Sequence, residues 1–299
     1  MDLSLECIYC TMNKADSLYS EHEADADKKL QFMKKVFGII AESAPGDTPP
    51  SLAAQIMRVF NSELQLGDPY DRIKKEYNSF LVSLENEILG VINAAADRLL
   101  TALKFAMVGN FIDFGAMDEV DIEDLKDIIH NAPQQIVDRA AYGDFCKDLE
   151  NSQRVAYLAD NAGEIVLDKI FIKIIKEFYP DIKLDVIVRG QPIYNDATLA
   201  DAREIGLCDL VQVVGNGTDI PGTQLSAINK QSKAIIDDAE MIIAKGQGNF
   251  ETLFGCGKNI YYLFLCKCDL FTRRFNMEKF RGILVNEKNV RELMGRGEQ

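Results

Sequence analysis

The sequence predicts an α/β protein, in which a helical amino-terminal part packs on a Rossmann-like three-layer α/β/α domain with a mostly parallel sheet. Two observations favour this fold class. Apolar residues recur at helical spacing in the first half of the chain, whereas after about residue 150 short apolar runs alternate with helical patterns or loops. We therefore expect a mainly helical domain over residues 1–150 and a Rossmann-like domain over residues 151–299.

The expected helices of the first part each have one apolar face. Apolar residues lie on one side of a helix in residues 30–40 and 52–64, and again in residues 84–103, which read as one longer helix. The stretch 44–51 is rich in Pro and Gly and separates the first two helices. Ser51 is the expected N-cap of the second helix.

The expected strands of the second part are short apolar runs. Strands that alternate with helices pair in parallel through right-handed crossovers. The runs predict six strands, at residues 155–159, 184–188, 210–214, 241–244, 260–265 and 283–285.

The acidic composition of the chain argues against some classes of binding partner. The chain has 33 basic and 47 acidic residues, so its formal charge is −14, and we expect neither nucleic acid nor an anionic membrane as a partner. No apolar run approaches the roughly 20 residues of a membrane span, and the first residues lack the basic and apolar regions of a secretion signal. Seven scattered cysteines favour reduced thiols. We expect a cytoplasmic protein whose oligomeric state the sequence leaves open.

Polar, glycine-containing motifs follow four of the expected strands. They are DNAGE at 160–164, RGQPIYNDAT at 189–198, GNGTDIPG at 215–222 and AKGQGNFE at 244–251. Ligands of open α/β sheets bind outside the carboxyl ends of the strands. The four motifs are therefore expected to converge on one crevice.

The residues of these motifs suit a metal and a phosphate. Asp160, Asn161 and Asp196 offer three oxygen ligands of the kind that Mg²⁺ or Mn²⁺ prefers. Arg189 and Lys245 offer positive charge for a phosphate. Metal, cations and glycine amides together are typical of phosphoryl transfer. The sequence therefore predicts a metal and phosphate site in the second domain.

These motifs, in this order and with GNFIDFG at 109–115 upstream, resemble those of the DUF89 family. The amino-terminal CIYC, with Cys7 and Cys10, resembles the prokaryotic branch of that family. Its members are described as metal-dependent phosphatases of small phosphorylated metabolites, implicated in metabolite damage control, with a helical domain joined to a Rossmann-like domain. The resemblance implies a divalent metal on Asp160, Asn161 and Asp196, and substrate contacts around Lys245 and at Arg189.

The expected reaction is hydrolysis of a small phosphorylated metabolite, with Mg²⁺ or Mn²⁺, or alternatively Co²⁺ or Ni²⁺, as cofactor. Asp160 is the candidate nucleophile, and an activated water is the competing option. The expected catalytic residues are Asp160, Asn161, Asp196 and Lys245. The further substrate-binding candidates are Arg189, Glu164, Asn195, Gly246, Asn249, Glu251, Asn110 and Asp113.

Other interpretations stay open at this point. Asp160 and Asp196 also suit helix caps or turns, and a lysine after a strand is more often solvated than catalytic. A methyltransferase using S-adenosylmethionine would place an acid at the end of the second strand, but Asp196 lies eight residues beyond Val188 and fits that role poorly. A non-catalytic module that binds a phosphorylated metabolite is a third possibility. Cys7 and Cys10 have either a metal or redox role, or none.

Overall fold

A six-stranded sheet forms the centre of the molecule in the computed structural model, which describes residues 1–295 apart from residues 2, 66 and 113–121. The strand order is β3-β2-β1-β4-β5-β6, and only β6 runs antiparallel to its neighbour, β5. The predicted fold class and all six predicted strands are confirmed. The strands are β1 (Arg154–Leu158), β2 (Lys183–Val188), β3 (Gln212–Gly215), β4 (Met241–Lys245), β5 (Ile260–Leu265) and β6 (Gly282–Asn286).

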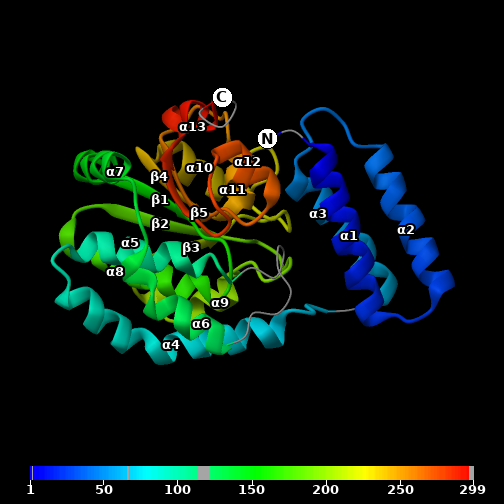
Figure 1. The fold of residues 1–299 in the computed structure, drawn as a ribbon, viewed down its shortest axis with the longest axis horizontal. Helices are drawn as coiled ribbons and strands as arrows, with labels where there is room; N and C mark the ends of the chain where they lie inside the picture. Colours follow the sequence, from blue (N-terminus) through cyan, green and yellow to red (C-terminus); the bar gives the residue numbers. More distant parts are fainter. Residues whose placement is uncertain (2, 66, 113–121, 296–299) are drawn as a thin grey trace.

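Helices cover both faces of this sheet, as Figure 1 shows. One face packs against α4 (Asp71–Ala94), α5 (Arg98–Gly109), α6 (Ile122–His130), α7 (Arg139–Asn151), α8 (Glu164–Phe178) and α9 (Leu199–Glu204). The other packs against α10 (Lys230–Asp238), α11 (Gly246–Leu253), α12 (Asp269–Phe275) and α13 (Glu287–Gly295). Short 3₁₀ turns lie at Ala132–Gln134 and Leu207–Asp209.

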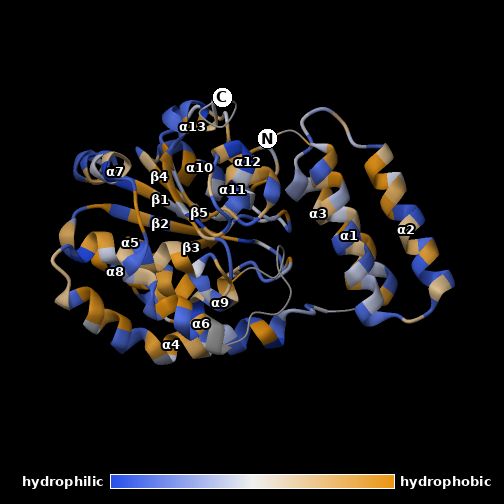
Figure 2. Cartoon of the chain, viewed as in Figure 1, coloured by the Kyte–Doolittle hydropathy of each residue, from blue (hydrophilic) through white to orange (hydrophobic). Residues whose placement is uncertain are grey.

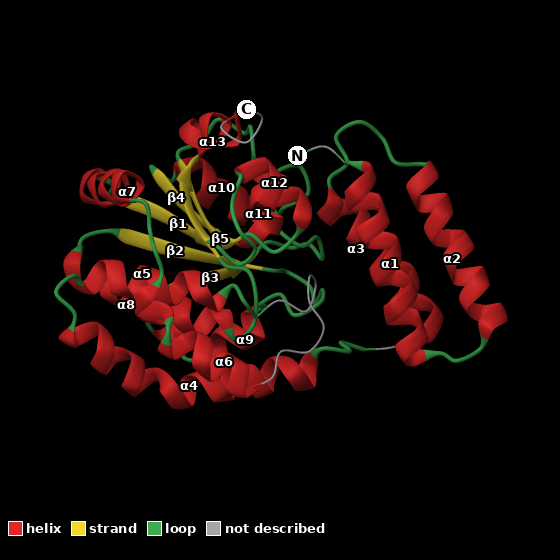
Figure 3. Cartoon of the chain, in the orientation of Figure 1, coloured by secondary structure: helices red, strands yellow, loops and turns green. Residues whose placement is uncertain are grey.

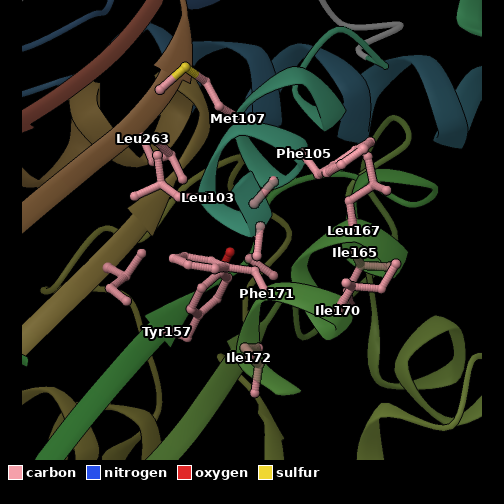
Figure 4. Packing of buried hydrophobic residues seen from close by; sticks show 14 of the residues in the cluster. Leu103, Phe105, Met107, Tyr157, Ile165, Leu167, Ile170, Phe171, Ile172 and Leu263 are labelled. Atoms are coloured by element: carbon pink, nitrogen blue, oxygen red, sulfur yellow. The ribbon is translucent and has the colours of Figure 1, made fainter. Parts of the chain in front are cut away.

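Burial on both faces explains the apolar strands. Figure 2 shows the strands as mostly hydrophobic ribbons, and every residue of β4 and β5 is buried. The larger core lies between the sheet and α5 with α8, where Leu103, Tyr157 and Phe171 are fully buried (Figure 4). Packing on both faces of the sheet removes apolar surface from contact with water, and this burial stabilises the sheet.

Three helices stand beside the sheet and its covering helices, as Figure 3 shows: α1 (Leu5–His22), α2 (Ala26–Ala41) and α3 (Pro49–Leu64). They enclose a core of their own, centred on Phe32 and Phe60, to which the other described residues contribute only Leu3, Ile193 and Tyr194. Together α1, α2 and α3 form the lid.

The N-cap predicted for α3 was wrong by three residues. Thr48 is the N-cap, because its side chain accepts a hydrogen bond from the backbone N–H of Ser51 at 3.2 Å. Ser51 is the third helical residue and completes a capping box, since its hydroxyl accepts from the Thr48 N–H at 3.0 Å. Two prolines fill the positions between them, where the missing N–H groups cost nothing.

The single long helix expected over residues 84–103 was also wrong. It is two helices, because α4 ends at Ala94 and Asp97 caps α5 by accepting from the Leu100 N–H at 2.9 Å. Apolar residues keep their helical spacing across residues 95–97, so the spacing alone does not reveal that the helix ends there. Asp97, a preferred N-cap residue, is the feature of the sequence that marks the start of a new helix. This break turns α5 so that its last residues reach the carboxyl ends of the strands.

The helices before residue 150 are of two kinds. The lid has its own core, whereas α4, α5 and α7 share the large core with the sheet. A domain boundary at residue 150 stays a prediction. Within the described part of the chain, none of the helices combines the length and the apolar character that a membrane crossing requires.

Candidate active site

A pocket of about 570 Å³ lies at the carboxyl ends of the strands, between them and the lid. Its walls include Asp160 and Asp196 from the strand side and Lys14 and Pro50 from the lid. The sheet order reverses between β1 and β4, which is where ligands bind in folds of this type. A smaller pocket, of about 180 Å³, lies at the opposite ends of the strands, beside Lys183 and Gln212.

Asp160, Asn161 and Asp196 all line the larger pocket. A backbone bridge pairs Asn161 with Asp196, and the N–H of Ala197 donates to the carbonyl of Asp160 at 2.8 Å. These bonds join the loop after β1 to the loop after β2. Asp160 does not cap the following helix, because the N-cap of α8 is Gly163.

Arg189 lies behind the two acids and does not line the pocket. Its Nε donates to Asp196 Oδ2 at 2.5 Å, and one Nη lies 3.6 Å from Asp160 Oδ1. The guanidinium therefore reduces repulsion between two buried carboxylates that face the pocket.

Lys245 is fully buried and also lies outside the pocket lining. Its ammonium donates to Glu164 Oε1 at 2.7 Å, to the Ala106 carbonyl at 2.9 Å and to Asp168 Oδ1. Burial raises the pKa of the Asp168 carboxyl to about 7, and the nearby Lys245 opposes that shift. Tyr157 completes the cluster by donating its hydroxyl to Asp168 at 2.7 Å.

Asn110 and Glu164 connect the buried Lys245 cluster to Asp160, which lines the pocket. The Asn110 amide donates to Asp160 Oδ2 at 3.1 Å and to Glu164 Oε2 at 3.2 Å, and its oxygen accepts from the Leu265 N–H at 3.0 Å. The Asn161 amide donates to the same two carboxylates at 2.9 and 3.0 Å. Two amides thus fix the orientation of the Asp160 carboxylate, and their own positions are fixed by β5 and Glu164.

Gly246 leaves room for the Asp160 carboxylate. It has φ +76°, and a Cβ at this position would lie 1.8 Å from Asp160 Oδ2. Any other residue would clash with the carboxylate and adopt a backbone conformation that L-residues avoid. The first turn of α11 is thereby packed directly against the candidate ligand.

The remaining predicted residues lie at different depths. Glu251 lines the pocket. Asn249 is buried behind it, where its amide donates to the Lys245 carbonyl at 2.7 Å and its oxygen accepts from the Thr223 hydroxyl at 2.7 Å. Asn195 is also buried, and donates to the Ile112 carbonyl at 3.2 Å. Asp113 lies outside the described residues.

Lys267 is the pocket residue that the sequence prediction missed. It lies two residues beyond the end of β5, is 4% exposed and lines the pocket together with Asp160 and Asp196. A cation near the end of a strand was the feature that selected Lys245, and Lys267 has a similar position. Lys267 lies between Cys266 and Cys268, and no glycine-containing motif of the kind that follows the other strands marks its position.

The donor set facing the pocket suits a divalent metal. Two carboxylates and one amide are hard oxygen donors, and Mg²⁺ needs few protein ligands because it keeps several waters. The described residues contain no group of three or more His, Cys, Asp or Glu side chains placed to hold a metal ion. A site here would depend on the amide of Asn161 as its third ligand.

The sequence as a whole assigns this fold and its pocket to one known class of protein. The chain belongs to the family of damage-control phosphatase ARMT1-like domains, whose model matches residues 3–281. Within that class it is similar to a damage-control phosphatase of Pyrococcus horikoshii, with 28% identity over 297 residues covering 97% of this chain and 99% of the relative. It is also similar to a damage-control phosphatase of Archaeoglobus fulgidus, with 29% identity over 280 residues covering 91% and 95%.

A solved structure supports the same assignment. The crystal structure of a DUF89 family protein from Pyrococcus horikoshii superposes with a TM-score of 0.84 at 25% identity, over 96% of this chain and 99% of that one. The predicted membership of the DUF89 family is confirmed.

Proposed function

We propose that the chain is a divalent-metal-dependent phosphatase of small phosphorylated metabolites. One observation carries the proposal: Asp160, Asn161 and Asp196 face the same pocket as Lys267. Oxygen donors on one wall and a buried cation on another suit a metal and the phosphate that it would neutralise. The names of the two damage-control phosphatases to which the chain is similar support the reaction class.

Asp160, Asn161 and Asp196 would hold the metal, and Mg²⁺ or Mn²⁺ fits these oxygen donors best. When bound, such an ion supplies Lewis-acid stabilisation of charge on a phosphoryl oxygen. The amides of Asn110 and Asn161 hold the Asp160 carboxylate toward the pocket, and Arg189 sets the position of Asp196 from behind. These residues position the ligands before substrate binds.

Lys267 is the proposed phosphate-binding cation. A lysine that is nearly buried yet lines a pocket places its positive charge where water screens it least. In this structure Lys245 and Arg189 contact carboxylates behind the pocket wall, which supports a positioning role for both. Asp160 lines the pocket and remains the proposed nucleophile, with water as the alternative.

The pocket size supports a small substrate. A volume of about 570 Å³ is within the usual range of small-molecule sites. The lid closes one side of the pocket through α1 and the first turn of α3, which limits access of water to the reacting phosphate. A sugar phosphate or a compound of similar size would fill such a site.

The test is an assay of phosphate release after removal of metal with EDTA. p-Nitrophenyl phosphate and a panel of sugar phosphates would be tried with Mg²⁺, Mn²⁺, Co²⁺ or Ni²⁺ added back. We expect metal-restored turnover in the wild type and in Asp181→Asn, a surface control, and a loss of at least about 100-fold in Asp196→Asn. Folded wild-type protein that binds metal but releases no phosphate from any substrate would favour a binding module instead.

A further inference from the structure

Three thiols line the pocket and take no part in the proposed reaction. Cys7 and Cys10 lie on α1 in the lid, and Cys268 directly precedes α12 beyond the end of β5. All three are free thiols in this structure. Residues more than 250 positions apart in the chain thus meet where the lid faces the strand ends.

Non-covalent contacts hold the lid at this seam. Arg58 of α3 pairs with Asp219 through Nε and Oδ2 at 2.6 Å, and Glu6 of α1 pairs with Arg273 of α12. Both arginine side chains are more than half exposed, so these pairs hold the lid weakly. A covalent bond at the seam would therefore change how firmly the lid is held.

Cys7 and Cys10 are poorly placed to bond with each other. They lie three residues apart on an uninterrupted helix, where Cβ atoms are about 5–6 Å apart. A disulfide needs about 3.5–4.5 Å between Cβ atoms, so this pair would have to unwind the helix. A cysteine of the other wall is the better partner.

Cys7 is the lid thiol that we pair with Cys268. It is buried, whereas Cys10 is exposed. Its chain neighbour Glu6 pairs with Arg273 of α12, Cys268 is the N-cap of that same helix, and both thiols line the pocket, so α1 and the start of α12 meet at this point. The Ser4 hydroxyl donates to Cys7 Sγ at 3.2 Å and fixes the position of the sulfur. No metal-binding cluster of these thiols with neighbouring acids exists in the described part of the chain.

We propose that Cys7 and Cys268 form a reversible disulfide that joins α1 to α12 across the mouth of the pocket. With a peroxide as oxidant, the Cys7 sulfur attacks one oxygen, the O–O bond breaks, and Cys7 sulfenic acid and water form. The Cys268 sulfur then attacks the Cys7 sulfur, the S–S bond forms, the S–O bond breaks and a second water leaves. Two thiols lose two electrons and two protons, and a small thiol reductant reverses the change.

The bond would hold the lid against the strand ends. It closes a loop of most of the chain, so it restricts the unfolded state strongly and stabilises the folded protein. Its effect on turnover rests on the proposed phosphatase function, since a fixed lid blocks the exchange of substrate and product. The bond itself is tested without any activity assay.

The experiment treats reduced, full-length protein with hydrogen peroxide in the presence of EDTA, followed by non-reducing peptide mapping and thermal unfolding. We expect a Cys7–Cys268 peptide and a rise in Tm of about 5 °C or more, both reversed by reductant. Cys10→Ser and Cys146→Ser, a control on α7, keep both effects. Cys268→Ser and Cys7→Ser lose both.

Three outcomes overturn the proposal. They are a Cys7–Cys10 bond as the product, oxidation to sulfinic or sulfonic acids without a cross-link, and an unchanged thiol content in the folded wild type. Because none of these readouts involves phosphate release, failure of this proposal is distinguishable from failure of the proposed function.

Discussion

Two buried lysines, Lys245 at the end of β4 and Lys267 two residues beyond β5, face different surroundings. Lys245 contacts two buried carboxylates and a backbone carbonyl, whereas Lys267 lines the pocket. Removal of a buried ion-pair partner leaves uncompensated charge, so we expect Lys245 to matter first for stability. Lys267 lines the pocket, so we expect it to matter for ligand binding.

We expect Lys245→Met to lower the free energy of unfolding by about 3–5 kcal/mol, because Glu164 and Asp168 lose their counter-charge. Lys267→Met is expected to raise KM or lower kcat/KM by at least about 10-fold. Urea unfolding and steady-state kinetics on both variants check this. A Lys267→Met enzyme with wild-type kinetics would rule out phosphate binding by Lys267.

Asp168 gives a prediction about pH. Its carboxyl has an ordinary pKa of 3.8, which burial raises to about 7 in the folded protein. Between these values the folded state binds more protons than the unfolded state, so the contribution of Asp168 to stability is present at low pH and is lost as pH rises toward 7. We expect the wild-type free energy of unfolding, minus that of Asp168→Asn, to fall from pH 5 to pH 7 and then level off. Urea titrations at pH 5, 6, 7 and 8 measure it, and a constant or rising difference would contradict the assignment.

At the scale of a single residue, the sequence predicted which loops meet at the pocket better than how deeply each side chain is buried. Oxygen donors after β1 and β2 were predicted, and Asp160, Asn161 and Asp196 do line one pocket. Whether a lysine at a strand end points into the pocket or behind it depends on packing between layers. Lys245 turns toward α5 and α8, where the Ala106 carbonyl and Glu164 receive it, and no local pattern in the sequence encodes that choice.

The turn from β4 into α11 shows how one element fixes the position of another. Gly246 begins α11 with φ +76° and lies against the Asp160 carboxylate that follows β1. The sequence placed both residues at strand ends. Their contact follows from the pairing of β1 with β4, which the alternation of strands and helices does not determine.

We expect Gly246→Ala to lower both stability and activity, because the new Cβ would clash with Asp160. Gly257→Ala is the matched control, since Gly257 has φ +77° but open space around its Cβ position. The backbone conformation alone costs about 1–3 kcal/mol in each variant. Thermal unfolding and kinetics should show a larger loss of stability in Gly246→Ala and a loss of activity in that variant alone. Equal behaviour of the two variants would show that Asp160 has room to move.

At the scale of the whole molecule, the lid and the sheet form two packed units around one pocket. The helical periodicity predicted α2 and α3, but not that α4, α5 and α7 would share the large core while α1–α3 would enclose a small one. Which helices share a core depends on contacts between distant parts of the chain. Periodicity within one helix carries no information about them.

We predict that the lid unfolds independently of the sheet. Phe60→Ala removes a fully buried ring from the lid core and should cost that unit about 3–5 kcal/mol. Hydrogen exchange should then accelerate in α1–α3 and stay slow in β1 and β4. Leu103→Ala, in the core shared by α5 and the sheet, is the control and should accelerate exchange in the strands. Loss of protection throughout the chain in Phe60→Ala would mean that the two units unfold together.

The central claim is that Asp160, Asn161 and Asp196 form a divalent metal site that faces Lys267. The most direct test is a crystal structure of the full chain with Mn²⁺ and inorganic phosphate, with the ion located by its anomalous scattering. The account predicts a peak in coordination distance of oxygens from all three residues, with phosphate between the ion and the Lys267 ammonium. A peak elsewhere, or phosphate bound away from Lys267, would contradict it.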